Sequence, residues 1–254
     1  MSKIYKALAR AEAERGASGP PTKGNRSAEI LVPRADSHHT SGHVDLPERR
    51  EEYEKLKVML TLEASRSELR SVLLVSALPG EGVSTVTLGL AASMAEAARQ
   101  GILVIDLNSA NPVLADRLGL RADIGLGDLL AKDAAAADAI VESEVSRLFL
   151  LGRGRASVDL SQPSSLALFD ELIRGIRSDF DHILFDGGSL ATSPDSLLVA
   201  SKVDGVILVV QAERTGSETI RDASNQLRMA GANVLGVVLN RRRDYLPGFL
   251  ARRL

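Results

Sequence analysis

The chain contains no cysteine and no tryptophan, and aromatic residues make up only 3% of its 254 positions. The missing thiols exclude disulfide bonds and cysteine chemistry, as is typical of a reducing compartment. No apolar run reaches the roughly 20 residues that cross a bilayer. The N-terminal stretch MSKIYKALARAEAERG also lacks the apolar centre of a secretion signal. We therefore expect a soluble, cytoplasmic protein.

A charge excess of either sign is also missing. The 31 Lys and Arg residues nearly balance the 33 Asp and Glu residues, and the formal net charge is -2. This balance does not attract nucleic acid, so we expect no nucleic-acid partner. Hydrophobic residues still make up 44% of the chain, which is enough for one substantial core. A core of Leu, Val, Ile and Ala suits the packed helices and parallel strands of α/β proteins.

The N-terminal part of the chain differs in composition from the rest. Residues 1–15 predict a short amphipathic helix, which either is solvated or docks onto a partner. Residues 16–46 are rich in Gly, Pro, Ser and His without a periodic pattern, and predict a flexible linker. No regular frame of carboxylates or thiolates surrounds the three histidines of this linker, so we expect no metal site at His38, His39 and His43.

Apolar runs alternate with amphipathic segments across residues 47–243. Six continuous apolar runs predict buried strands, at 71–77, 102–107, 147–152, 182–186, 204–211 and 233–240. Six amphipathic segments predict helices, at about 47–64, 83–100, 125–131, 163–180, 194–202 and 217–230. This alternation predicts one three-layer α/β domain, in which helices cover both faces of a mainly parallel sheet.

The segment after the strand at 71–77 has the composition of a phosphate-binding loop. Gly80 and Gly82 let the backbone bend tightly and approach oxygen atoms, and consecutive N–H groups then form an anion site at a helix N-terminus. Ser84 stands where the hydroxyl of this motif binds magnesium. The predicted nucleotide-binding residues of the loop are Gly80, Glu81, Gly82, Val83, Ser84 and Thr85.

Two other predicted strands end in aspartate. Asp106 ends the run ILVID, and Asp186 ends the run HILFD. The carboxyl ends of parallel strands meet at one edge of a sheet, where carboxylates hold a magnesium ion or its waters. We therefore predict that Asp106 and Asp186 are catalytic residues and that both, with Ser84, bind Mg²⁺.

Together these segments resemble the bacterial tyrosine kinases, which are cytosolic P-loop proteins of capsule and exopolysaccharide export. The resemblance covers about residues 50–243. It implies a P-loop NTPase fold, ATP or ADP with Mg²⁺ as the cofactor, and a membrane polysaccharide co-polymerase, or chain-length determinant protein, as the partner. The segments that carry it are SALPGEGVST, LVIDLNSANP, IGLGDLL, FDHILFDGG, SPDSLLVASKVDGVILVVQAERT and ANVLGVVLNR.

The same resemblance implies further properties. The protein would attach peripherally to the inner membrane through that partner, and would form a homo-oligomer or pair with an active kinase sibling. The pair Asn240-Arg241 resembles the family's contact on the adenine side. Tyr245, in the basic tail 244–254, is the candidate phosphoacceptor, although a lone tyrosine also serves as a packing residue.

The chain departs from the family's pattern at several charged positions. Val83 replaces the loop lysine, Asn108 replaces a second aspartate and Ala110 replaces an arginine. The residues 187–189 read Gly-Gly-Ser where Thr-Pro-Pro is usual. Phosphoryl transfer depends on positioning and charge neutralisation. The replacements therefore predict a degenerate site with impaired catalysis.

Three functions remain open from the sequence. The first is a non-catalytic or weakly nucleotide-binding partner in polysaccharide export. The second is an active ATP-dependent tyrosine autokinase that modifies Tyr245, and the third is a nucleotide-gated ATPase switch like those of plasmid partition and division-site placement. A cation from elsewhere in the chain would favour activity, and Arg153 and Arg155 either reach the site or lie in solvent.

Overall fold

A computed structural model describes the chain over residues 28–33, 50–65, 67–157 and 159–242. The expected N-terminal helix, the three linker histidines and the basic tail with Tyr245 lie outside these residues. No helix in the described ranges is both long enough and apolar enough to cross a membrane.

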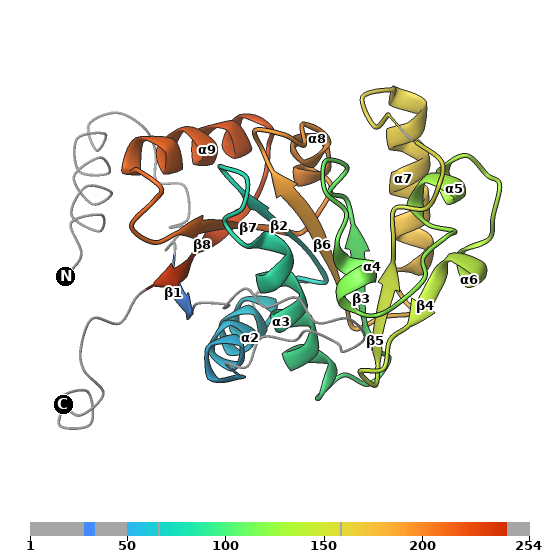
Figure 1. Cartoon of the computed structure of the whole chain (residues 1–254), viewed down its shortest axis with the longest axis horizontal. Coiled ribbons are helices and arrows are strands. Elements are labelled where there is room, and N and C mark those ends of the chain that lie inside the picture. Colours follow the sequence, from blue (N-terminus) through green and yellow to red (C-terminus); the bar gives the residue numbers. More distant parts are fainter. Residues whose placement is uncertain (1–27, 34–49, 66, 158, 243–254) are drawn as a thin grey trace.

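Within the described residues, eight strands form one sheet in the order β1-β8-β7-β2-β6-β3-β5-β4 (Figure 1). All neighbouring strands pair in parallel except β4, which is antiparallel to β5 at one edge. The strands span Ala28–Pro33 (β1), Ser71–Ser76 (β2), Ile102–Asp106 (β3), Ile140–Glu142 (β4), Leu148–Leu151 (β5), His182–Ser189 (β6), Gly205–Gln211 (β7) and Val234–Arg242 (β8).

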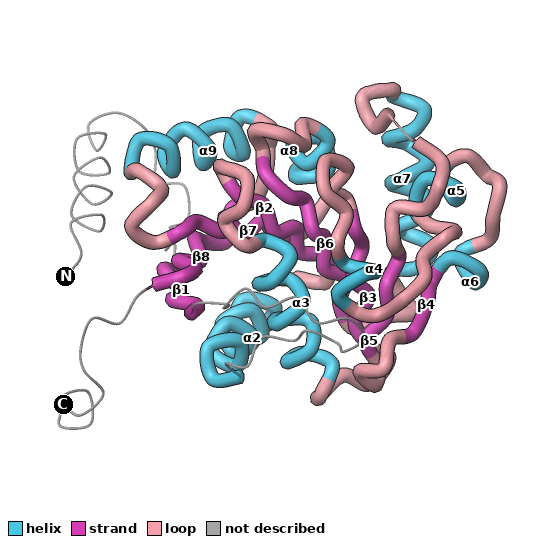
Figure 2. The backbone as a smooth tube through the Cα atoms, viewed as in Figure 1, coloured by secondary structure: helices cyan, strands magenta, loops and turns pink. Residues whose placement is uncertain are grey.

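Helices cover both faces of this sheet (Figures 1 and 2). The helices α2, α3 and α4 contribute to the core on one face, and α5, α7, α8 and α9 contribute to the core on the other. The helices span Arg50–Ala64 (α2), Val83–Ala95 (α3), Leu114–Arg117 (α4), Leu126–Leu130 (α5), Ala136–Ala139 (α6), Pro163–Ile176 (α7), Asp195–Ala200 (α8) and Ser217–Met229 (α9).

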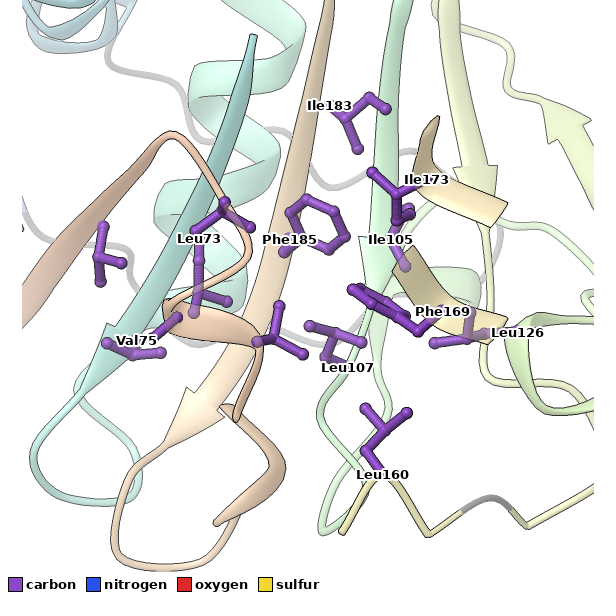
Figure 3. Close-up of a cluster of buried hydrophobic side chains, with 14 of the residues drawn as sticks. Leu73, Val75, Ile105, Leu107, Leu126, Leu160, Phe169, Ile173, Ile183 and Phe185 are labelled. Carbon is purple, nitrogen blue, oxygen red and sulfur yellow. The ribbon is translucent and has the colours of Figure 1, made fainter. Parts of the chain in front are cut away.

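The alternation of side chains along each strand produces two separate cores. In β2, Leu73 and Val75 face the α7 side, while Val72 and Leu74 face the α3 side. Figure 3 shows the α7-side core, where the rings of Phe169 and Phe185 lie with centroids 6.0 Å apart. Burial of one such side chain contributes about 1.5–3 kcal/mol. The sheet is therefore held from both faces, as expected for a three-layer α/β fold.

The structure confirms the predicted fold class and each of the six predicted strands and six predicted helices, with shifted ends. The elements β4, α4 and α6 were not predicted, because they have only three or four residues. The strand β1 was not predicted either, because its six residues lie in a segment rich in Gly, Pro and Ser. The assignment of residues 28–33 to a flexible linker is corrected, since these residues form β1 and pair with β8. The apolar run Ile-Leu-Val in β1 suits a strand, but the Gly- and Pro-rich sequence around it favoured a linker, and only the pairing with β8 decides its structure.

The helix α2 packs closely on α3 through an aromatic ring. Tyr53 of α2 is 2% exposed and lies directly over Gly89 of α3. A Cβ atom added to Gly89 would be 2.3 Å from the Cζ atom of Tyr53. The absence of a side chain at this position therefore sets the distance between the two helices.

We predict that Gly89→Ala lowers the free energy of unfolding by roughly 1–3 kcal/mol, because the added methyl overlaps a buried ring. The matched control is Gly175→Ala in α7, where an added Cβ meets no atom within 4 Å. That substitution should be neutral or stabilising by about 0.5–1 kcal/mol, since Ala favours the helix. Urea unfolding of both variants measures the difference. Equal effects at the two positions would contradict the proposed contact.

Candidate functional site

The strand order brings three of the predicted motifs to one edge of the sheet. The strand β6 lies between β2 and β3 and pairs with both. Asp186 of β6 is the Cα partner of Asp106 of β3. The loop that follows β2 begins at the same edge. The predicted glycine loop and both predicted carboxylates therefore form one site.

The glycine loop enters α3 through a left-handed residue. Gly82 caps α3 with a φ of 94°, a conformation that strongly favours glycine. A Cβ atom at Gly82 would also lie 2.1 Å from Nδ2 of Asn240, which donates a hydrogen bond of 2.8 Å to the Glu81 carbonyl. Asn240 is 2% exposed. Its amide therefore holds the loop in place, a role that the sequence did not suggest.

Glu81 supports the loop with a fully buried side chain. Its carboxylate accepts hydrogen bonds from the Leu78 N–H at 2.8 Å, the Gln211 N–H at 3.0 Å and the Thr215 hydroxyl. These contacts join the loop to the end of β7. The predicted role of Glu81 in nucleotide binding is thus restricted to its backbone, because its side chain faces the protein.

Val83 has a hydrocarbon side chain packed in the core on the α3 side. It is 5% exposed and belongs to the same cluster as Val86 and Val209. The P-loop motif carries a lysine at this position, whose ammonium group reaches the β- and γ-phosphates. Burial of valine stabilises the fold at this point, but the loop presents no positive side chain of its own to a phosphate.

Asp106 is a buried carboxylate that holds the following segment. It is 2% exposed and accepts hydrogen bonds from the N–H groups of Asn108 at 3.0 Å and Leu114 at 3.4 Å. Burial, followed by the nearby charge of Asp186, raises the pKa of Asp106 to about 7. In the absence of a cation, the site therefore favours the neutral carboxyl group of Asp106 at pH values below about 7.

Asp186 is fully buried and incompletely bonded. Its Oδ1 atom accepts a hydrogen bond of 3.1 Å from the Gly188 N–H, and its carboxylate accepts another from the Ser84 hydroxyl. Burial raises its pKa, while the bonds from Ser84 and Gly188 and the charge of Arg117 oppose that shift. Its Oδ2 atom has no partner, which costs about 1–3 kcal/mol. An oxygen-lined site with an unpaired carboxylate atom fits a hard cation such as Mg²⁺.

A cavity of about 270 Å³ lies in front of this edge. The loop from Pro79 to Thr85 lines it together with two arginines, Arg117 and Arg241. Arg117 donates a hydrogen bond of 2.7 Å to the Thr85 hydroxyl, and Arg241 donates one of 3.2 Å to the Gln211 side chain. Arg241 was predicted at this site. Arg117 was missed, because it lies outside every motif and only the tertiary fold brings it there.

Two residues at which the sequence predicts a departure from the kinase pattern, Asn108 and Gly188, are in contact. Gly188 has a φ of 65°, and a Cβ atom there would lie 2.7 Å from the Cγ atom of Asn108. The Oδ1 atom of Asn108 accepts a hydrogen bond of 3.2 Å from the Asn111 N–H. Gly188 leaves room for the amide of Asn108, and the two residues pack together beside Asp106 and Asp186.

The sequence leaves open whether Arg153 and Arg155 reach the site. Neither arginine donates a hydrogen bond to the glycine loop in the structure. Arg153 donates a hydrogen bond of 3.3 Å to the Leu107 carbonyl, and its charge acts on Asp106. Arg155 is exposed and pairs with Asp123 at 3.2 Å. Tyr245 lies outside the described residues, so its proposed role as phosphoacceptor stays a prediction.

Comparison with known proteins identifies the family. Tyrosine-protein kinase CpsD of Streptococcus agalactiae is 30% identical over 185 residues, which cover 72% of this chain and 80% of that protein. The chain belongs to the family of bacterial tyrosine kinases. No model of a known protein family matches it. The transport protein ExoP of Rhizobium meliloti, named for succinoglycan biosynthesis, is 31% identical over 178 residues, 69% of this chain but 22% of ExoP.

Several solved structures share the fold. The kinase domain of VpsO is 30% identical with a TM-score of 0.66, covering 75% of this chain and 93% of that one. The chimerical protein CapA2B2 has a TM-score of 0.72 at 22% identity, covering 85% and 94%. The septum site-determining protein MinD of Pyrococcus horikoshii, solved with Mg-ADP, has a TM-score of 0.56 at 26% identity, covering 72% and 76%.

We predict that Asp106→Asn raises the free energy of unfolding of the metal-free protein, relative to the unmodified chain, more at pH 8 than at pH 5. The pKa of Asp106 is raised in the folded state, so its carboxyl group contributes stability at low pH that is lost as the pH rises through about 7. The amide removes this loss, on the order of 2 kcal/mol over that range. Chemical unfolding in EDTA at both pH values measures the effect. A variant with the pH dependence of the unmodified chain would contradict it.

We also predict that Glu81→Ala destabilises the protein by roughly 2–4 kcal/mol, because buried N–H groups lose their acceptor. Glu171→Ala on the exposed side of α7 removes the same charge, and should change stability by less than about 0.5 kcal/mol. Thermal and urea unfolding compare the two variants. A loss at Glu81 as small as that at Glu171 would show that the Glu81 carboxylate does not support the loop.

Proposed function

We propose that the chain is a non-catalytic, weakly nucleotide-binding member of the bacterial tyrosine kinases that acts in capsule or exopolysaccharide biosynthesis or export. The observation that carries this proposal is the buried hydrocarbon of Val83 at the position of the phosphate-binding lysine. A valine offers no donor and no charge to the transferred phosphate. Stabilisation of developing charge is the main contribution of a protein to phosphoryl transfer.

The retained groups support binding of a nucleotide with Mg²⁺. The N–H groups of the loop from Gly80 to Thr85 would hold the phosphates at the N-terminus of α3. Ser84, Asp106 and Asp186 would hold Mg²⁺ or its waters, and the unpaired Oδ2 atom of Asp186 supports this assignment. When bound, Mg²⁺ neutralises phosphate charge. The Mg-ADP complex of the structurally similar MinD is consistent with such a site.

The relatives support a role beside a membrane polysaccharide co-polymerase. In ExoP, a transport protein of succinoglycan biosynthesis, the similar segment is 22% of a much longer protein. The present chain would provide the corresponding function beside a co-polymerase. It would then attach to the inner membrane through the co-polymerase, alone, as a homo-oligomer or with an active kinase sibling, and would affect polymer length or export.

An active autokinase is the second candidate. The retained Asp106 and Asp186, with the Ser84 hydroxyl bonded to Asp186, favour it. Tyr245 would then be the phosphoacceptor. A nucleotide-gated ATPase switch has only the structural similarity to MinD in its favour.

We predict that the purified chain transfers no phosphate from Mg-ATP to tyrosine and binds Mg-ATP weakly. Val83→Lys should tighten Mg-ATP binding by about 10- to 100-fold, since a hydrogen bond to a charged group is worth about 1.5–3 kcal/mol. Mass spectrometry of the whole chain, including Tyr245, detects phosphate, and calorimetry measures affinity. The matched control is Ala92→Lys, which adds the same charge to α3 at a partly exposed position outside the cavity.

Phosphotyrosine that forms in the unmodified chain and disappears in Asp106→Ala would overturn the non-catalytic proposal in favour of the autokinase. Loss of the modification in Tyr245→Phe would then identify the acceptor. Tight Mg-ATP binding that Val83→Lys does not improve would show that Val83 does not limit the site. Nucleotide-dependent dimerisation in light scattering would instead favour the ATPase switch.

A further inference from the structure

Arg117 contacts the glycine loop although it comes from α4, which belongs to no phosphate-binding motif. We propose that Arg117 binds the phosphates of a nucleoside di- or triphosphate in this cavity, and supplies from a different element the cation that the loop lacks at Val83. The proposal rests on nucleotide binding by the loop, as proposed above. It does not depend on whether the protein transfers phosphate.

The position of Arg117 is fixed by the core. The neighbouring Leu114 and Leu118 are fully or almost fully buried and belong to the α3-side cluster. The Leu114 N–H donates to Asp106 at 3.4 Å, and the Arg117 N–H donates to the Val113 carbonyl at 3.1 Å. The carboxylate that ends β3 therefore also anchors the helix that carries Arg117. Such an arginine is already in place before a ligand arrives.

The guanidinium group has donors left for a ligand. It donates to the Thr85 hydroxyl at 2.7 Å, at the end of the loop, and lines the cavity. An arginine carries five N–H donors in a planar fork, which suits bidentate contact with phosphate. The described residues form no ion pair with Arg117. The acidic group whose pKa its charge affects at the site is Asp186, a proposed Mg²⁺ ligand.

The other arginines near the site have partners elsewhere. Arg241 is bonded to Gln211, Arg153 to the Leu107 carbonyl and Arg155 to Asp123. Arg214 is exposed and donates to Gln211 at 3.3 Å. Of these side chains, Arg117 is the one whose hydrogen bond ends on the loop itself.

The position of the Arg117 guanidinium group determines which phosphates of a nucleotide it can contact. Arg117 meets the loop at Thr85, within the first turn of α3, whereas a lysine at residue 83 would extend toward the terminal phosphates. The loop backbone holds the α- and β-phosphates. We therefore expect Arg117 to contact the phosphates shared by ADP and ATP, and the cavity to bind the two nucleotides with similar affinity.

Calorimetry with Mg-ADP, Mg-ATP and Mg-pyrophosphate tests this proposal on the full chain. Arg117→Ala should weaken all three affinities by at least about tenfold, and Arg117→Lys by less, because lysine keeps the charge but loses the fork. Arg121→Ala is the matched control, since it removes the same charge from an exposed neighbour and should leave affinity unchanged. The double variant Val83→Lys/Arg117→Ala should regain Mg-ATP binding. Circular dichroism checks that each variant is folded.

Affinity that is equal in Arg117→Ala and Arg121→Ala would overturn the proposal and leave nucleotide binding to the loop alone. Absence of binding of all three ligands to the unmodified chain would overturn it as well, together with the weak nucleotide binding proposed above, while the absence of phosphoryl transfer would stand. Mg-ATP bound more than about tenfold tighter than Mg-ADP would show that the cation acts at the terminal phosphate. Tyrosine phosphorylation would instead contradict the proposed function and would not bear on Arg117.

Discussion

The pairing of β6 with both β2 and β3 is the constraint on which the site depends. It places two buried carboxylates, Asp106 and Asp186, side by side at the edge where the glycine loop begins. Each carboxylate raises the energy of the other in a medium that solvates charge poorly. The fold tolerates this because the hydrophobic cores on both faces of the sheet supply the stability. The repulsion between the two carboxylates also favours the binding of a cation at this edge.

The loop itself combines retained and altered features. Its backbone is held from behind by Glu81 and Asn240, whose side chains are bonded within the protein. This support does not involve residue 83, so a valine there leaves the backbone geometry intact and adds to the core. The backbone conformation of the loop therefore does not depend on a charged side chain at residue 83. The chain has kept the shape of a phosphate-binding loop, while its positive charge comes from arginines on other elements.

Two residues that the sequence predicts to differ from the family pattern also lie together in space. Asn108 and Gly188 are distant in sequence but in contact beside the carboxylates. A side chain at residue 188 would collide with the amide of Asn108. Consequently a larger residue at position 188 would force the side chain of residue 108 to move, whereas Asn108→Asp keeps the same side-chain size.

The sequence by itself determined the fold class, the strands with continuous apolar patterns, and the assembly of Asp106, Asp186 and the loop, because buried strands and phosphate loops have strong local signals. Elements of three or four residues, such as β4 and α4, have no such signal, and β1 lies within a segment that resembles a linker. The internal roles of Glu81 and Asn240 and the arrival of Arg117 at Thr85 depend on contacts between residues far apart in the chain. Only the tertiary structure decides such contacts, because packing, and not local sequence, selects which side chains meet.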